Sequence, residues 1–190
     1  KGLQWLLLHQ GGEGGWGNNI NTAWACLALH EFGTNPDELE KAVDYLKMFI
    51  NKDGGWGIYP GEASDPFTSA LVLLALYKCD STLPEVAKGL AYLQKLVEDE
   101  AWMNKALAYY NISEISHLLW DDPEFASIKE SYLSFLKEFP DQQNYDYLAR
   151  KISLMAKTGE DVADFITQLL TGQNSDGGWG FGPGYSSDPL

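Results

Sequence analysis

The sequence predicts an all-α protein of about five stacked helical hairpins, arranged as an α/α solenoid or a closed toroid. Three observations predict this fold. The tetrapeptide Gly-Gly-Trp-Gly occurs three times, at 14–17, 54–57 and 177–180. A helical pattern precedes each copy, over 2–10, 42–51 and 162–173. Amphipathic segments alternate with wholly apolar ones, as stacked hairpins require.

The tryptophans set the period of the repeat. Trp16 and Trp56 are 40 residues apart, Trp56 and Trp102 are 46 apart, and Trp102 and Trp179 are 77 apart. Trp102 lies in a copy that has lost its glycines, and the last interval has room for one copy without the motif. Such self-similarity is typical of solenoids and toroids. The expected repeats are approximately 1–36, 37–80, 81–122, 123–158 and 159–190, the last one truncated.

The motif has a physical explanation of its own. Residues 53–67 align without a gap to residues 176–190, so the repeat extends beyond the tetrapeptide. Glycines permit a tight reversal between two helices, including backbone conformations with positive φ. The tryptophan is expected to pack back over the turn and fill the gap between neighbouring hairpins. The motif is therefore predicted to be structural.

Each repeat is predicted to contain two helices of different character. The first is amphipathic, and the second, over 22–32 and 69–77, is apolar on every side and must be covered on every side. The sequence Thr82-Leu-Pro-Glu85 predicts a capping box at one helix start. The apolar faces of the first helices are formed by Leu39, Ala42, Val43, Leu46, Phe49 and Ile50, by Val86, Leu90, Leu93 and Val97, and by Phe125, Ile128, Tyr132, Phe135 and Phe139.

Composition excludes several classes of protein. The chain has 190 residues, 45% of them hydrophobic, and a net charge of −14, so it is a folded acidic protein. Its surface repels phosphate backbones, and nucleic acid is not an expected partner. No stretch reaches the roughly 18 apolar residues of a membrane-spanning helix. Two cysteines form no disulfide framework, so the compartment, cytoplasmic or exported, is left open.

These repeats resemble a known family. Gln10 precedes Trp16 by six residues, and Gln173 precedes Trp179 by the same six, whereas the middle copy has Ile50 at the glutamine position. This spacing is similar to the glutamine–tryptophan repeat of squalene–hopene and oxidosqualene cyclases. Their superfamily also contains protein prenyltransferase β-subunits and complement-like thioester domains. The resemblance implies an α/α toroid. We expect this chain to be a fragment that forms an incomplete α6/α6 barrel.

The resemblance can be tested at the positions that would carry cyclase chemistry. Class II cyclases protonate the substrate with the middle aspartate of an Asp-x-Asp-Asp-Thr-Ala motif, and a carboxylic acid is indispensable there. In the three aligned copies that position holds Ile20, Phe67 and Leu190. Asp65 and Asp188 remain, but Ser-Asp-Pro before an apolar run favours a helix cap. The sequence therefore predicts no catalytic acid.

Metal and cofactor chemistry is not expected either. The prenyltransferase β-subunits bind zinc with an Asp-x-Cys pair and a distant histidine, but neither Cys26 nor Cys79 has an aspartate two residues before it. His9, His30 and His117 have no ligand spacing among them. Phosphate-binding loops, a serine elbow and the thioester Cys-Gly-Glu-Gln are absent. The sequence thus predicts neither a metal site nor a cofactor.

A toroid would bring the starts of its inner helices to one mouth of the barrel. An aromatic, partly polar cavity there would suit an apolar or amphipathic ligand. The side chains expected near this mouth are Asn18, Asn21, Asp65, Thr68, Asn104, Tyr109, Asn144, Tyr145 and Asp188.

Three functions agree with the sequence. The first is a repeat domain without cyclase chemistry that binds an apolar small molecule or a protein partner. The second is part of a terpenoid cyclase whose acid lies outside these residues. The third is a structural domain of a larger exported protein. Because an open ring of apolar helices exposes a patch, homodimerisation or coverage by a partner segment is also predicted.

Overall fold

The computed structural model describes residues 1–33, 35–98 and 144–187, and these residues contain seven helices and no strand. The all-α prediction is therefore confirmed for this part of the chain. The protein divides into two compact units, Lys1–Leu118 and Leu119–Leu190, and each is described by itself. Closure into a toroid and the repeat boundaries stay predictions, and Trp102 lies outside the described residues.

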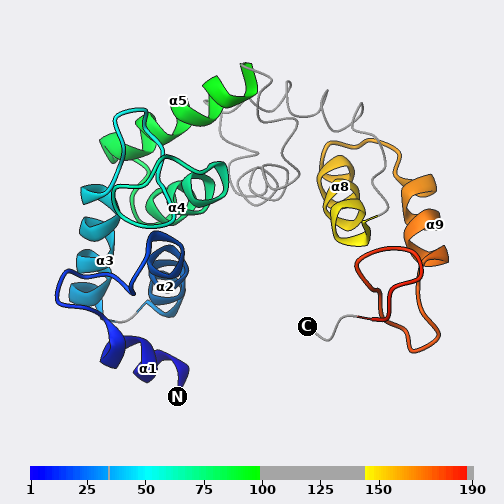
Figure 1. The fold of residues 1–190 in the computed structure, drawn as a ribbon, viewed down its shortest axis with the longest axis horizontal. Helices are drawn as coiled ribbons and strands as arrows, with labels where there is room; N and C mark the ends of the chain where they lie inside the picture. Colours follow the sequence, from blue (N-terminus) through cyan, green and yellow to red (C-terminus); the bar gives the residue numbers. More distant parts are fainter. Residues whose placement is uncertain (34, 99–143, 188–190) are drawn as a thin grey trace. The chain divides into compact units, whose positions relative to one another are not determined.

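The described helices of the first unit lie in two layers (Figure 1). One layer holds α1 (Gly2–His9), α3 (Pro36–Met48) and α5 (Pro84–Glu98), and the other holds α2 (Asn19–Phe32) and α4 (Pro66–Cys79). α4 packs against α2 and α5, and α3 packs against α2 and α4. Consecutive helices thus form hairpins that stack side by side, as the alternation of helix types predicts.

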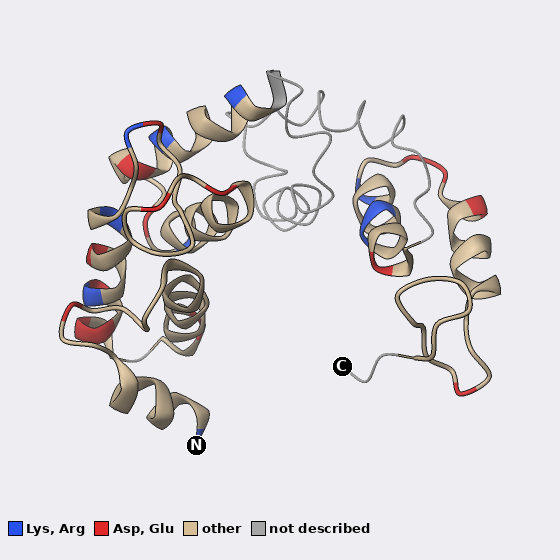
Figure 2. Cartoon of the chain, viewed as in Figure 1, with Lys and Arg blue, Asp and Glu red and all other residues tan. Residues whose placement is uncertain are grey.

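Burial follows the character of each helix. Every residue of α4 from Thr68 to Leu76 is buried, as expected for a helix that is apolar all round. Figure 2 shows that charged residues lie on α3, on α5 and in the turns, whereas α2 and α4 carry very few. Burial of each large apolar side chain contributes about 1.5–3 kcal/mol, so the α4 contacts form the main core of this unit.

The start of α5 differs from the prediction. The helix begins at Pro84, and the Thr82 hydroxyl donates to Asp80 Oδ1 at 2.6 Å instead of serving the helix N-terminus. Glu85 Oε2 is buried without a hydrogen-bond partner among the described residues. The predicted capping box is therefore wrong. The helix begins at Pro84, so Leu83 and not Thr82 directly precedes it, and the Thr82 backbone N–H that Glu85 would accept in a capping box donates to Asp80 Oδ1 at 2.9 Å.

The three turns of the Gly-Gly-Trp-Gly motif share one side-chain hydrogen bond. In each copy the indole Nε1 donates to the backbone carbonyl ten residues earlier, near the end of the preceding helix. This bond folds the ring back over the turn, as predicted, and supplies a donor to a carbonyl in the last turn of the helix. The pairs are Trp16 with Leu6 at 3.0 Å, Trp56 with Leu46 at 2.7 Å, and Trp179 with Leu169 at 2.7 Å.

The glutamines of the first and last copies close the same turn. Gln10 Nε2 donates to the Gly14 carbonyl at 2.9 Å and to the Glu38 carbonyl, also at 2.9 Å, which joins the turn to α3. Gln173 Nε2 donates to the Gly177 carbonyl at 2.7 Å. The middle copy has isoleucine at this position and cannot form the bond.

The first glycine of each motif has the positive φ that the sequence predicts. The φ angles are 93° at Gly14, 91° at Gly54 and 85° at Gly177. Two of these glycines also lie directly against the following helix, Gly14 against Lys41 of α3 and Gly54 against Lys88 of α5. The glycine thus permits both the turn and the close approach of the next hairpin.

The second unit contains α8 (Tyr145–Lys157) and α9 (Ala163–Thr171), which pack against each other. The buried face of α8 includes Lys151, whose Nζ lies 4.4 Å from the centroid of the Phe165 ring. The α9 helix leads into the third copy of the motif, as the sequence predicts.

Candidate functional site

The first two predicted cavity residues lie at the start of α2 and form hydrogen bonds there. Asn18 is the N-cap of α2, and its Oδ1 accepts from the Asn21 backbone N–H at 2.7 Å. The Asn21 amide donates to the Trp16 carbonyl at 3.3 Å. Both side chains therefore join the motif turn to the start of α2, and this role accounts for the residue types.

Asp65 plays the same role at α4. Its Oδ1 accepts from the Thr68 backbone N–H at 2.8 Å and from the Thr68 hydroxyl at 3.0 Å. The interpretation of Asp65 as a helix cap is confirmed. The positions that the resemblance assigns to a catalytic acid hold Ile20 and Phe67, both half-buried in the first turns of their helices. Neither side chain can donate a proton to an alkene.

One titratable side chain near the start of α4 has a strongly shifted pKa. Burial, with a smaller contribution from the charges of Asp53 and Asp65, raises the pKa of Tyr92 to about 12, although a hydrogen bond with Ser69 opposes the shift. Tyr92 is therefore a neutral phenol at physiological pH. It serves as a hydrogen-bonding core residue rather than as an acid or base.

We expect Asp65→Ala to lower the free energy of unfolding by about 1 kcal/mol, because the first turn of α4 loses its cap. Asp65→Asn retains an acceptor oxygen and should cost only a few tenths of that amount. Urea unfolding monitored by circular dichroism measures both variants. If Asp65→Asn lowers the free energy of unfolding as much as Asp65→Ala does, the carboxylate has a role other than capping.

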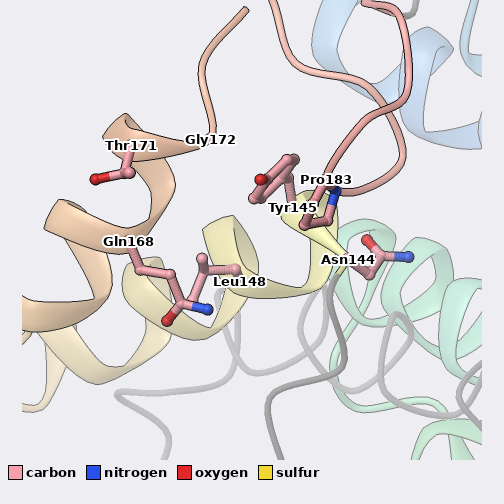
Figure 3. Close-up of a pocket in the computed structure, with 7 residues that line it drawn as sticks. All are labelled: Asn144, Tyr145, Leu148, Gln168, Thr171, Gly172 and Pro183. Atoms are coloured by element: carbon pink, nitrogen blue, oxygen red, sulfur yellow. The ribbon is translucent and has the colours of Figure 1, made fainter.

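Of the remaining predicted site residues, Tyr145 lies in the second unit, and Asn104, Tyr109 and Asp188 lie outside the described residues. Tyr145 and Leu148 of α8 border a pocket of about 320 Å³ with Gln168 and Thr171 of α9 (Figure 3). Asn144 also borders the pocket, and its buried Nδ2 has no hydrogen-bond partner in the described part of the chain. Convergence of the predicted residues at one mouth stays a prediction.

A larger apolar hollow lies between α1 and α2. Its volume is about 420 Å³, within the usual range of small-molecule sites. Two of its indoles are unusually exposed, Trp5 at 56% and Trp24 at 51%. We call it the α1–α2 groove. It is lined by Trp5, Leu6, His9, Trp16, Asn21, Trp24, Ala25 and Ala28.

The floor and edge of the α1–α2 groove are preorganised by side-chain contacts. The His9 and Trp5 rings stack with centroids 4.2 Å apart, and His9 Nδ1 lies 2.7 Å from the Trp5 carbonyl oxygen. The Trp16 indole is fixed by its bond to Leu6. Among the described residues, no carboxylate or ammonium group lines the groove, so it favours an uncharged apolar occupant.

The exposed Trp24 was not predicted as a site residue. Alignment of the repeats puts Trp24 of α2 at the position of Leu71 of α4. Leu71 is only 4% exposed, because α4 is covered by other helices of the unit, whereas Trp24 is 51% exposed. A large aromatic residue at a position where the second copy has a buried leucine was the sequence signal for this groove.

The described residues contain no cluster of histidine, cysteine, aspartate or glutamate that could hold a metal ion. His9 stacks on Trp5, and His117 lies outside the described residues. None of the helices described is long and apolar enough to cross a membrane.

Comparison with known proteins points to terpenoid cyclases. The chain is 40% identical over 53 residues to drimenyl diphosphate synthase of Streptantibioticus cattleyicolor, a match that covers 28% of this chain and 10% of that protein. It is 36% identical over 98 aligned positions to squalene–hopene cyclase of Bradyrhizobium diazoefficiens, covering 42% of this chain and 14% of that protein. No protein-family model matches the sequence.

These similarities support a terpenoid cyclase-like helical repeat. They agree with the all-helical structure of the described residues. The chain spans about a tenth to a seventh of the length of the two relatives that it matches.

Proposed function

We propose that this chain is a terpenoid cyclase-type repeat domain whose α1–α2 groove binds the hydrocarbon chain of an isoprenoid-like molecule. The observation that carries the proposal is the groove itself, in which three indole rings line a hollow that has no carboxylate or ammonium group among its described lining residues. Aromatic faces supply a large apolar contact area at low cost in conformational entropy. The names of both relatives describe terpenoid chemistry, which supports this class of ligand.

Binding without catalysis is the role that the described residues support. Asp65 is engaged in capping α4, and Ile20 and Phe67 occupy the positions of the acid. Protonation of an alkene needs a well-placed acid, and neither hydrocarbon side chain supplies one. We therefore expect the isolated chain to bind an isoprenoid probe and to leave it unchanged.

Titration with farnesol, an isoprenoid alcohol, tests the groove through the fluorescence of its tryptophans. We expect saturable binding, and roughly tenfold weaker binding in Trp24→Ala, because one wall of the groove is lost. Phe32→Ala is the matched control, since Phe32 is an equally exposed aromatic residue of α2 that does not line the groove. It should bind farnesol like the unsubstituted chain.

Sedimentation of the same variants identifies a different occupant. The position of Trp24 corresponds to the covered Leu71, so a helix from a second copy could cover this face. A dimer that dissociates in Trp24→Ala, together with no farnesol binding, would contradict the ligand proposal and favour a protein interface.

A second function is favoured by the names of both relatives, and it is catalysis by a terpenoid cyclase in which another segment supplies the acid. The α1–α2 groove would then form part of the wall of the cavity that holds the cyclase substrate. Cyclised squalene formed when this chain is combined with a segment that supplies the acid, and none from the chain alone, would favour this function over binding without turnover.

A further inference from the structure

The chain has two cysteines, and the fold brings them together. Cys26 in the middle of α2 and Cys79 at the end of α4 are 53 residues apart in sequence, yet their Sγ atoms are 3.4 Å apart. Both thiols are free. A disulfide requires an Sγ–Sγ distance near 2 Å, so a shift of little more than 1 Å would join them.

The two thiols differ in exposure and in acidity. Cys26 is fully buried, whereas Cys79 is half-buried. The Cys26 thiol hydrogen-bonds to Cys79 and lowers the pKa of Cys79, although burial and the adjacent Asp80 carboxylate oppose the shift. The same bond, together with burial, raises the pKa of Cys26. Cys79 is therefore the accessible nucleophile and Cys26 the protected partner.

The position of Cys79 gives it room to move. It is the last residue of α4, followed by Asp80, whose backbone N–H donates to the Leu76 carbonyl. Side chains at a helix end are less restrained than those inside a packed helix. Cys26, in contrast, is fixed within the α2–α4 contact.

We propose that Cys26 and Cys79 form a reversible dithiol–disulfide pair that cross-links α2 to α4, with a low-molecular-weight disulfide as the oxidant. The Cys79 thiolate attacks one sulfur of the oxidant, forms a mixed disulfide and releases one thiolate. Cys26 then loses its proton, attacks Cys79 Sγ and releases the second thiol. Two protein thiols are oxidised and one small disulfide is reduced to two thiols.

Incubation of the folded protein with oxidised glutathione tests the pair. Intact mass should fall by two hydrogens without a glutathione adduct, and peptide mapping should yield a Cys26–Cys79 cross-link. Because the bond closes a long loop in the unfolded chain, Tm should rise by several degrees and return on addition of dithiothreitol. Two alkylatable thiols after this treatment, or cross-links between chains, would overturn the proposal.

Single variants separate the two steps. Cys26→Ser should stop at a mixed disulfide on Cys79, because the resolving thiol is absent, and Cys79→Ser should take up no glutathione while folded. Cys26→Ala provides the same information if serine is not tolerated in the core. None of these three variants should show the oxidant-dependent rise in Tm. Stable glutathione adducts on the unsubstituted protein would show that Cys26 does not resolve the first step.

Discussion

Replacing Trp56 with alanine is expected to lower the free energy of unfolding by about 3–5 kcal/mol. The Trp56 side chain is completely buried. Its ring lies against Gly89 of α5, and its Nε1 donates to the Leu46 carbonyl at the end of α3. Removal leaves a cavity where two hairpins meet and a helix-end carbonyl without its donor.

Two further variants extend this test. One separates the hydrogen-bond donor from the aromatic ring, and the other compares two copies of the motif. Trp56→Phe retains an aromatic ring but loses the donor, and we expect it to cost roughly 2 kcal/mol. Trp179→Ala removes the equivalent indole of the third motif, which is only half-buried, so about 1–2 kcal/mol is expected. Urea unfolding measures all three. A loss under about 1 kcal/mol in Trp56→Ala would contradict the role of the motif in joining hairpins.

The turn and the caps could be predicted because their causes are local. A glycine pair that precedes a tryptophan restricts the turn, and Ser-Asp-Pro before an apolar run determines the start of α4. Both predictions hold at Trp56 and Asp65. The capping box failed for a similarly local reason, because Asp80 accepts from the Thr82 backbone N–H in place of Glu85, and the sequence pattern does not rank these two carboxylates.

The cysteine pair could not be predicted, since it depends on contacts between the first two repeats, and the only sequence signal for the α1–α2 groove was Trp24. Nothing in the sequence near Cys26 or Cys79 indicates the other, and their proximity comes from the packing of α2 on α4. The exposure of Trp24 likewise depends on which helices cover α2. The predicted convergence of polar residues at one mouth of the barrel depends on a closed ring of helices. The sequence predicts such a ring only through its resemblance to a known family.

A second large effect is expected for Gly54→Ala, which should lower the free energy of unfolding by about 3 kcal/mol, the sum of a backbone cost and a contact cost. The backbone at Gly54 has a φ of 91°, which costs an alanine roughly 1–2 kcal/mol. A Cβ atom there would also lie 2.5 Å from the Lys88 carbonyl oxygen of α5. Because that neighbour is helix backbone, the overlap can be relieved only by moving the next hairpin, at a further cost of about 1–3 kcal/mol.

Gly61→Ala separates the two causes within the same unit. Gly61 has a φ of 83°, but a Cβ atom at this position would meet no other atom within 4 Å, so only the backbone cost of roughly 1–2 kcal/mol is expected. Urea unfolding of both variants gives the difference, which measures the contact between the Gly54 turn and α5. Equal losses would mean that α5 can move away freely, and that the motif glycine is required for the turn alone and not for stacking.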